Sequence, residues 1–204
     1  MSKKHPTVEN ILRANKAIRQ AKNNILNIHF PRLGLFNEWK IQVFGDASWG
    51  NLPDGTSSAQ GHVIFLTGKD NSCCPLSWKS NKVKRKVSST LAAETLSLHD
   101  ALDEAIYCKG LICETCFNVK VCDLPVLGFT DNKSLYENVY STKQVNEKRL
   151  RINIAEIRRL IDEKEVKSIE WIEGEVQIAD ILTKRGVNPD QIARVFETGK
   201  LDFL

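Results

Sequence analysis

The sequence predicts an α/β fold. A five-stranded mixed sheet, three antiparallel strands and then two parallel ones, is flanked by helices and preceded by an N-terminal helical arm. Three observations predict this fold. Two apolar segments, 41–46 and 126–131, each end on an aspartate. Segment 41–46 is followed by two more strand-like segments across short polar connections, and such connections favour antiparallel neighbours. A long amphipathic segment then precedes 126–131, and a parallel strand needs a crossover of that length.

The N-terminal part, residues 1–37, is interpreted as the arm, and residues 38–204 as the folded domain. Segment 7–27 has apolar residues at helical spacing, and Thr7 is suited to cap its N-terminus. The apolar stripe needs a docking surface, which is either the following domain or something outside this chain. A run containing Phe30, Pro and Gly breaks the helical pattern, so a connection is expected at 30–34.

The elements of the domain are predicted in the order strand, strand, strand, helix, strand, helix, helix, strand, helix, with one more short helix. The expected ranges are strands 39–46, 60–67, 74–79, 126–131 and 166–172, and helices from about 88, at 133–140, 147–164, around 178–182 and at 189–196. Segment 126–131 is apolar on both faces, so it should be central and parallel to a neighbour. If that neighbour is 41–46, Asp46 and Asp131 lie side by side at the carboxyl ends, where open α/β sheets bind ligands.

Length and composition bound the function. A chain of 204 residues forms one domain, with or without an accessory arm, and its net charge of +4 permits an anionic partner without requiring one. No apolar run approaches the roughly 18 residues of a membrane span, and the N-terminus lacks the apolar stretch of a signal peptide. We therefore expect an intracellular protein with no membrane partner.

The six cysteines are expected to be reduced in that compartment. A zinc knuckle needs two tight pairs of ligands, but the set Cys108, Cys113, Cys116 and Cys122 contains a single C-x-x-C. Free thiols are therefore favoured over a zinc site.

Four acids stand in or beside apolar runs: Asp46, Glu94, Asp131 and Asp180. Burying unpaired charges is costly, and bringing them together adds repulsion unless cations bind between them. An all-oxygen site favours Mg²⁺ or Mn²⁺. Two such ions about 4 Å apart can activate a water and stabilise the leaving oxygen of a phosphodiester. Taken singly, each acid could equally be a cap or a solvated edge residue, so the prediction rests on all four together.

Six sequence blocks, in order, resemble the ribonuclease H domain of copia-type retrotransposon Pol polyproteins. The blocks are Asp46-Ala47-Ser48-Trp49, Cys73–Trp78, Ser88–Leu96, Thr130–Leu135, Glu147–Ile152 and Ala179–Lys184. The resemblance covers about residues 38–190 and implies a ribonuclease H-like fold. The arm resembles the segment that joins reverse transcriptase to this domain, and no polymerase motif is present. The chain is then expected to be a C-terminal piece of a larger Pol, or a protein derived from one.

The resemblance implies a metal-dependent endonuclease that cleaves the RNA strand of RNA–DNA hybrids during reverse transcription, leaving a 3′-hydroxyl and a 5′-phosphate. Asp46 and Asp131 would each contact metal, with Asp46 bridging two ions. Glu94 would hold one ion and approach the 2′-hydroxyl, the group that separates RNA from DNA. Asp180 would hold the ion of the attacking water. The implied partners are the hybrid and the reverse transcriptase portion of the same polyprotein, in a cytoplasmic virus-like particle or in the nucleus.

One departure from the family concerns the loop before the last catalytic helix, where many ribonucleases H carry a histidine. Segment 173–177 has none, and slow turnover is the favoured consequence. Substitution for it by Glu173 or Glu175 is the less favoured alternative.

A basic cluster precedes the helix that carries Glu94, and it is the predicted substrate-binding segment: Lys79, Lys82, Lys84, Arg85 and Lys86. A solvated loop or a localisation signal are the alternatives. The charges of helix 147–164 are interpreted as a solvated face. Trp49 and Trp78 could stack on nucleic acid, but core positions are favoured for both.

Two other functions stay open. A catalytically weak or domesticated module could bind nucleic acid without cleaving it, although the presence of all four acids argues against decay. An integrase or transposase of related fold is disfavoured because those enzymes use the order Asp, Asp, Glu, whereas this chain has Asp, Glu, Asp, Asp.

Overall fold

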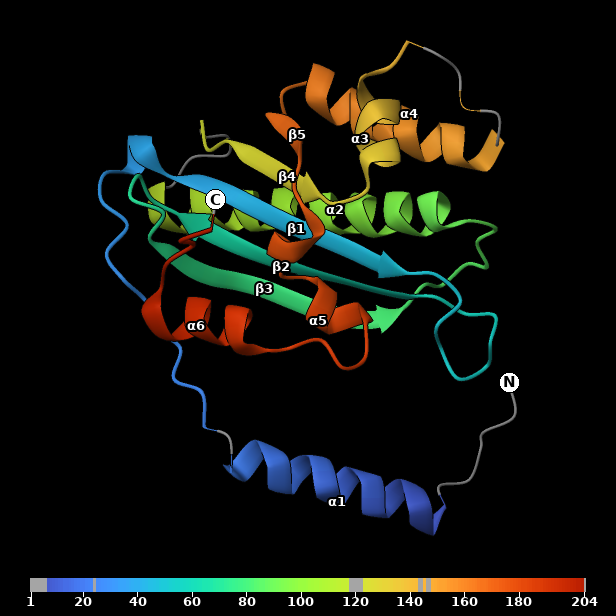
Figure 1. The fold of residues 1–204 in the computed structure, drawn as a ribbon. Helices are drawn as coiled ribbons and strands as arrows, with labels where there is room; N and C mark the ends of the chain where they lie inside the picture. Colours follow the sequence, from blue (N-terminus) through green and yellow to red (C-terminus); the bar gives the residue numbers. More distant parts are fainter. Residues whose placement is uncertain (1–6, 24, 118–122, 143–144, 146–147, 204) are drawn as a thin grey trace.

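The computed structural model describes residues 7–23, 25–117, 123–142, 145 and 148–203 (Figure 1). Its centre is an open five-stranded sheet in the order β3-β2-β1-β4-β5. The strands are β1 (Lys40–Ser48), β2 (Ala59–Thr67), β3 (Cys73–Lys82), β4 (Val126–Thr130) and β5 (Ser168–Trp171). The helices are α1 (Val8–Asn23), α2 (Thr90–Phe117), α3 (Lys133–Tyr140), α4 (Lys148–Asp162), α5 (Asp180–Thr183) and α6 (Asp190–Thr198), with short 3-10 turns η1 (Phe36–Glu38) and η2 (Gly174–Val176). The predicted fold class is confirmed.

The pairing of the strands is the predicted one. β1 and β2, and β2 and β3, are antiparallel, whereas β4 lies parallel to both β1 and β5. Phe44 of β1 is opposite Phe129 of β4. Asp46 and Asp131 each follow two residues later, so both acids leave the sheet at the same edge.

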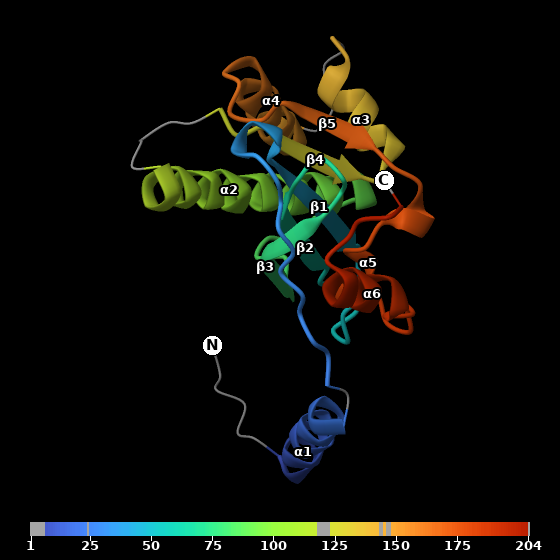
Figure 2. The ribbon, with the colours of Figure 1, turned by 90° about the vertical axis from the view of Figure 1, so that its left-hand side faces the viewer.

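Helices pack on both faces of the sheet (Figure 2). Successive residues of a strand point to opposite faces, and Val43 and Phe44 accordingly belong to two different cores. Val43 packs with side chains of α2, α3 and α4. Phe44 packs with the segment that contains α5 and α6, including Ile178 and Phe196. The sheet is thus held between two helical layers, and α2 and α5, which carry Glu94 and Asp180, belong to these layers.

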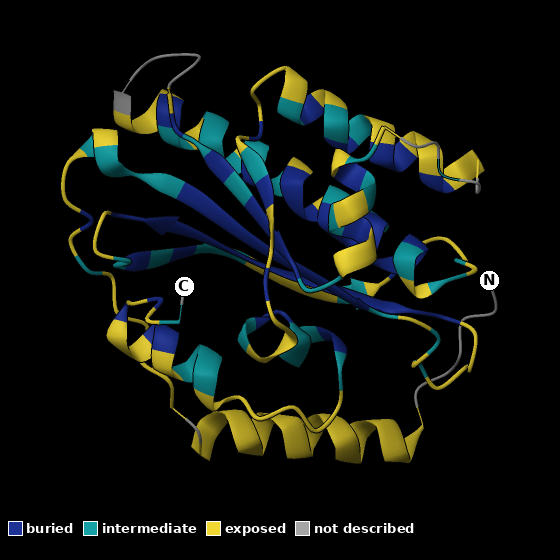
Figure 3. Cartoon of the chain, turned by 45° about the horizontal axis from the view of Figure 1, so that its top comes forward, coloured by how far each residue is buried: buried dark blue, intermediate teal, exposed yellow. Residues whose placement is uncertain are grey.

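Helix α1 forms as predicted, but it ends at Asn23 rather than at Asn27. The Thr7 hydroxyl accepts a hydrogen bond from the Asn10 amide at 3.3 Å, so Thr7 caps the first turn. Every residue of the helix is exposed (Figure 3). The connection that follows is irregular yet packed, because Leu33 is buried in the core and the His29 amide donates to Phe196 O at 2.7 Å.

The prediction of reduced cysteines needs a correction. Cys73, Cys74, Cys108 and Cys116 are free, but Cys113, a buried residue of α2, is disulfide-bonded. Spacing along the sequence did not indicate this bond, because pairing depends on how α2 meets its surroundings. The prediction for Cys122 lies outside the described residues. Among the described helices, none is long and apolar enough to cross a membrane.

Candidate active site

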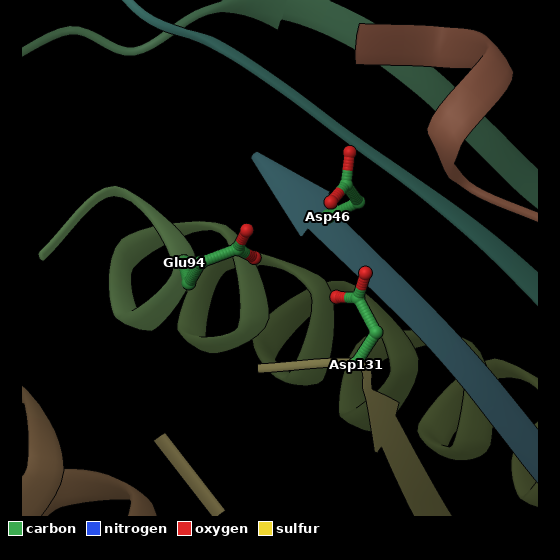
Figure 4. A group of neighbouring side chains, drawn as sticks. All are labelled: Asp46, Glu94 and Asp131. Atoms are coloured by element: carbon green, nitrogen blue, oxygen red, sulfur yellow. The ribbon is translucent and has the colours of Figure 1, made fainter. Parts of the chain in front are cut away.

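Three of the four predicted acids meet at the carboxyl edge of the sheet. Asp46 lies near the end of β1, Glu94 in the second turn of α2, and Asp131 directly after β4. One carboxylate oxygen from each lies within 4.8 Å of the other two. Figure 4 shows the three side chains turned toward a shared space between β1 and α2. Among the described residues, this is the one group of three acids, histidines or cysteines that is close enough to hold a metal ion.

Asp46 is fully buried. Its main-chain carbonyl accepts a hydrogen bond from Ser97 Oγ of α2 at 2.6 Å, and Thr183 Oγ1 of α5 donates to its Oδ2. Its other carboxylate oxygen, Oδ1, is buried and has no hydrogen-bond partner within the described part of the chain. A buried anionic oxygen without a partner is expensive, so Oδ1 is available for a cation.

Glu94 reaches the site because α2 lies close to β1. A Cβ on Gly45 would stand only 3.3 Å from Leu98 Cα, so the glycine permits the approach of the helix. Glu94 Oε2 accepts a hydrogen bond from the Ala47 amide at 3.2 Å. This contact orients the carboxylate toward the end of β1. Ser89 Oγ accepts from the Ala92 amide at 3.2 Å and fixes the start of the same helix.

Asp131 is held by the elements on either side of it. Trp171 of β5 donates from Nε1 to the main-chain carbonyl of Asp131 at 3.1 Å. The next residue, Asn132, caps α3 by accepting from the Leu135 amide at 2.9 Å. Gln177 donates to Gly45 O at 3.1 Å and also hydrogen-bonds to the Asp131 side chain. The carboxylate is therefore fixed by β4, β5 and the turn before α5.

The fourth predicted acid, Asp180, stands beside the group of three and is not part of it. Its Oδ1 forms an ion pair with Lys184 Nζ at 2.6 Å, and the same ammonium lies 3.7 Å from Asp46 Oδ1. Asp180 begins α5 and Lys184 directly follows its last residue, and both side chains reach Asp46 or each other at the site. Its role as a fourth metal ligand stays a prediction.

Burial and mutual repulsion disfavour the charged forms of the three acids. Burial raises the pKa of Asp46 to about 6, although the Thr183 hydrogen bond and the Lys184 charge oppose the rise. Burial, and then the charges of Asp46 and Asp131, raise the pKa of Glu94 to about 9. Burial also raises the pKa of Asp131. Burial lowers the pKa of Lys184, but the Asp180 hydrogen bond and the nearby acids raise it overall.

This arrangement fits a divalent cation. The ligand atoms are all carboxylate oxygens, which suit Mg²⁺ or Mn²⁺. Asp46 Oδ1, which has no hydrogen-bond partner among the described residues, is one available ligand, and a bound cation would offset the burial and repulsion that disfavour the charged carboxylates. The number and identity of the ions stay predictions.

The acids open onto a shallow cavity of about 340 Å³. It is lined by Ala47, Ser48, Trp49, Thr90, Glu94, Asp131, Asn132 and Lys184. Lys184, with Gln177 and Thr183, was missed by the sequence reasoning as a site residue. The signal that could have identified Lys184 was its position four residues after Asp180, at the end of the same short segment.

The five predicted substrate-binding residues separate in the structure. Arg85 and Lys86 line a second cavity of about 420 Å³, together with Lys148 and Arg149 from the start of α4. Lys79 and Lys82 lie on β3 instead, where Lys82 forms an ion pair with Asp54 at 3.0 Å, and Lys84 is an exposed residue after that strand. None of the described residues Lys79, Lys82 and Lys84 lines this basic cavity.

The favoured core positions of Trp49 and Trp78 are wrong. Their exposed fractions are 51% and 53%. Trp49 comes after the last paired residue of β1, and Trp78 lies on the edge strand β3, where Phe196 of α6 contacts its ring without covering it. Glu173 and Glu175, the residues considered in place of the missing histidine, are both exposed.

No protein-family model matches the chain, and no curated protein matches its sequence. Solved structures do match its fold. The N-terminal RNase H domain of rv2228c from Mycobacterium tuberculosis, solved as a fusion with maltose-binding protein, gives a TM-score of 0.50 at 17% identity, covering 76% of this chain and 96% of that one. LC11-RNase H1, isolated from compost, gives 0.50 at 21% identity, covering 71% and 92%. The chain therefore has a ribonuclease H-like fold, with an acidic cluster at the carboxyl edge of its sheet.

Proposed function

We propose that this protein is a metal-dependent endonuclease that cleaves the RNA strand of RNA–DNA hybrids. One observation carries the proposal. Three carboxylates from β1, α2 and the end of β4 converge within 4.8 Å at the ligand-binding edge of a ribonuclease H-like sheet. Packing alone gives no reason to bring three acids together there, because each raises the cost of charging the others.

The side chains would divide the work as follows. Asp46, Glu94 and Asp131 hold the divalent ions, Mg²⁺ or Mn²⁺, with Asp180 as the predicted fourth ligand. When bound, two such ions supply an activated water and stabilise the leaving oxygen of the phosphodiester. Thr183 and Ser97 fix Asp46, and Gln177 links Asp131 to β1. Carboxylates held in this way need little rearrangement when the ions and the substrate arrive.

The basic cavity supplies a place for the nucleic-acid backbone. Four cationic side chains, Arg85, Lys86, Lys148 and Arg149, line it from two elements that are distant in sequence. The acid cavity and the basic cavity share the first turns of α2, because Thr90 and Glu94 line the former whereas Ala92 and Thr95 line the latter. A strand whose phosphates lie on the cations can therefore reach the carboxylates along one helix.

The biological setting follows from the sequence resemblance. We propose that the chain acts within, or derives from, a copia-type retrotransposon Pol polyprotein. Residues 1–37 then join the nuclease domain, 38–204, to the reverse transcriptase portion. The work would take place in a cytoplasmic virus-like particle or in the nucleus. The ordered motif blocks between Asp46 and Lys184 support this setting.

The decisive experiment compares three duplexes of one sequence, an RNA–DNA hybrid, a DNA duplex and an RNA duplex, each labelled at one end. The full chain is incubated with each in Mg²⁺, in Mn²⁺ and in EDTA. We expect cleavage of the hybrid alone, only with metal, and products ending in a 3′-hydroxyl. Asp131→Asn should reduce the rate at least about a thousandfold, because a bound metal supplies several kcal/mol of transition-state stabilisation. Asp162→Asn makes the same change at an exposed residue that ends α4, and its rate should match that of the parent.

The outcomes separate the candidate functions. Folded protein that cuts no hybrid with either metal contradicts the nuclease. If that protein still binds hybrid tightly in EDTA, the chain is a nucleic-acid-binding module that does not cleave. Equal cleavage of the DNA duplex would retain the nuclease but contradict the hybrid as its substrate.

A further inference from the structure

Trp49 is an exposed aromatic side chain at the edge of the acid cavity. It follows Ser48, the last residue of β1, and stands three residues after Asp46. The side chain lines the same cavity as Glu94, Asp131 and Lys184. Half of the residue is exposed, although an indole is among the most costly groups to leave in water. None of the contacts that position the three acids requires a tryptophan there.

The indole is fixed in place by a hydrogen bond. Trp49 Nε1 donates to the main-chain carbonyl of Val87 at 3.1 Å. Val87 belongs to the segment before α2 whose Arg85 and Lys86 line the basic cavity, and Val87 itself lines that cavity. The ring therefore stands at the boundary between the two cavities. A ring anchored through its polar edge keeps its faces free and loses little conformational freedom when a ligand binds.

We propose that Trp49 is a substrate-positioning residue that packs against a ribose or base of the strand passing from the basic cavity to the carboxylates. The inference rests on the proposed nuclease function and adds a contact to it. The cations of the basic cavity would bind phosphates, and the ions held by the carboxylates would act on the scissile phosphate, so the nucleotide between the two cavities has its ribose and base left to contact the protein. An exposed aromatic face offers that contact to any nucleotide sequence.

A structural role for Trp49 makes a different prediction. If its purpose is only to hold segment 85–88 through the Nε1 hydrogen bond, then losing the N–H should matter and losing the aromatic face should not. Trp49→Phe removes the hydrogen bond and keeps an aromatic ring, whereas Trp49→Leu removes both. The two variants together therefore distinguish packing on substrate from anchoring of the segment.

Trp78 provides a matched control. It is equally exposed, but it lies on β3, and its ring packs on Phe196 of α6 with centroids 5.8 Å apart. It lines neither the acid cavity nor the basic cavity. Trp78→Leu thus removes a comparable indole at a distance from the proposed path of the strand.

The test is steady-state cleavage of the labelled hybrid in Mg²⁺ by the parent chain, Trp49→Leu, Trp49→Phe and Trp78→Leu. Trp49→Leu should raise KM by about tenfold or more, with a smaller change in kcat. Trp49→Phe should stay within about threefold of the parent, and Trp78→Leu should match it. In EDTA, adding hybrid should change the tryptophan emission of the parent and of Trp78→Phe, and this change should be lost in Trp49→Phe.

Each other outcome overturns the proposal. An unchanged KM in Trp49→Leu excludes the contact. Equal impairment of Trp49→Phe and Trp49→Leu assigns Trp49 to anchoring the segment. If the parent cleaves no hybrid, the nuclease function fails, and the emission titration still decides: an unaltered Trp49 signal excludes contact with hybrid. That titration needs only the parent and the two phenylalanine variants, so it holds even if the leucine variant does not fold.

Discussion

At the scale of single residues, Lys184 determines how the acidic cluster behaves before metal arrives. Its ammonium group is 2.6 Å from Asp180 Oδ1 and 3.7 Å from Asp46 Oδ1, on the side of Asp46 that has no hydrogen-bond partner among the described residues. A cation bound to Asp46 Oδ1 must share this space with a positive charge of the protein. The lysine therefore partly neutralises the acids, and under the proposed function it would compete with a metal ion for them.

Removing this charge should strengthen metal binding in the absence of substrate. For Lys184→Gln we expect the Mn²⁺ dissociation constant to fall by about threefold to tenfold at low salt, the range for one partly exposed charge. Titration calorimetry at pH 9, where protons compete least with the metal, measures this directly. Lys148→Gln removes an equal charge from the exposed start of α4 and should leave the constant unchanged. Weaker binding in Lys184→Gln alone would instead show that the lysine holds Asp180 and Asp46 in position for the ion.

The residue scale also shows what the sequence could predict. Asp46 and Asp131 were predictable because parallel strands share a carboxyl edge. In the pairing of β1 with β4, Phe44 is opposite Phe129, and each acid stands two residues further along the chain. The exposure of Trp49 was not predictable, since composition around a strand end does not say whether another element will cover it. The position of Lys184 was readable from helical spacing, but its ion pairs depend on where α5 lies.

At the scale of elements, the site depends on how closely the short helix α5 approaches β2. Gly61 of β2 makes that approach possible, because a Cβ at this position would stand 2.6 Å from Leu182 Cβ and 3.1 Å from Lys79 O. Ser80 Oγ donates to Leu182 O at 2.5 Å from the neighbouring strand. A helix of four residues cannot hold itself in place, so these contacts position Asp180, Thr183 and Lys184.

Gly61→Ala should therefore damage activity more than its cost in stability explains. The added methyl must push α5 from the sheet, which we expect to lower the free energy of unfolding by about 1–3 kcal/mol. Metal affinity and hybrid cleavage should fall even at temperatures where the variant is fully folded. Gly110→Ala is the matched control: a Cβ there meets nothing within 4 Å in the middle of α2. It should raise stability by up to about 1 kcal/mol without changing activity.

Urea denaturation and metal titration of the two variants measure these effects separately. A Gly61→Ala protein with parental metal affinity would mean that α5 adjusts without moving its polar residues.

The elements themselves were predicted well where apolar periodicity is strong, as in α4, whose buried face includes Leu150, Ile154 and Ile157. Their ends were less predictable, and β5 is shorter than expected because its pairing with β4 runs only from Ser168 to Trp171.

At the scale of the whole molecule, strand order followed from the sequence because the connections were diagnostic. Short polar turns required antiparallel neighbours, and the long helix α2 required a parallel return. The packing of segment 29–33 against α6 was not predictable, since it joins residues that are more than 160 positions apart. Long-range contacts of this kind leave no periodic signal in the sequence.

The acidic cluster also links the stability of the whole fold to pH. Burial and repulsion raise the pKa of Glu94 from 4.5 to about 9 and that of Asp46 from 3.8 to about 6. Between the ordinary pKa and the raised pKa of each acid, the folded, metal-free chain binds more protons than the unfolded chain does. The stability that protonated Glu94 contributes to the fold is therefore fully present below pH 4.5, and it is lost as the pH rises from 4.5 through 9. The loss is on the order of a few kcal/mol.

Divalent ions should reverse this trend, because they bind the deprotonated cluster of the folded state. Urea unfolding at pH 6 and at pH 9, each with and without Mg²⁺, should show that the metal-free chain is less stable at pH 9. Added Mg²⁺ should stabilise the chain more at pH 9 than at pH 6. Glu94→Gln carries no charge at either pH, so it should flatten the metal-free dependence and lose most of the gain from Mg²⁺. A metal-free parent that becomes more stable between pH 6 and pH 9 would contradict the burial of three acids in one site.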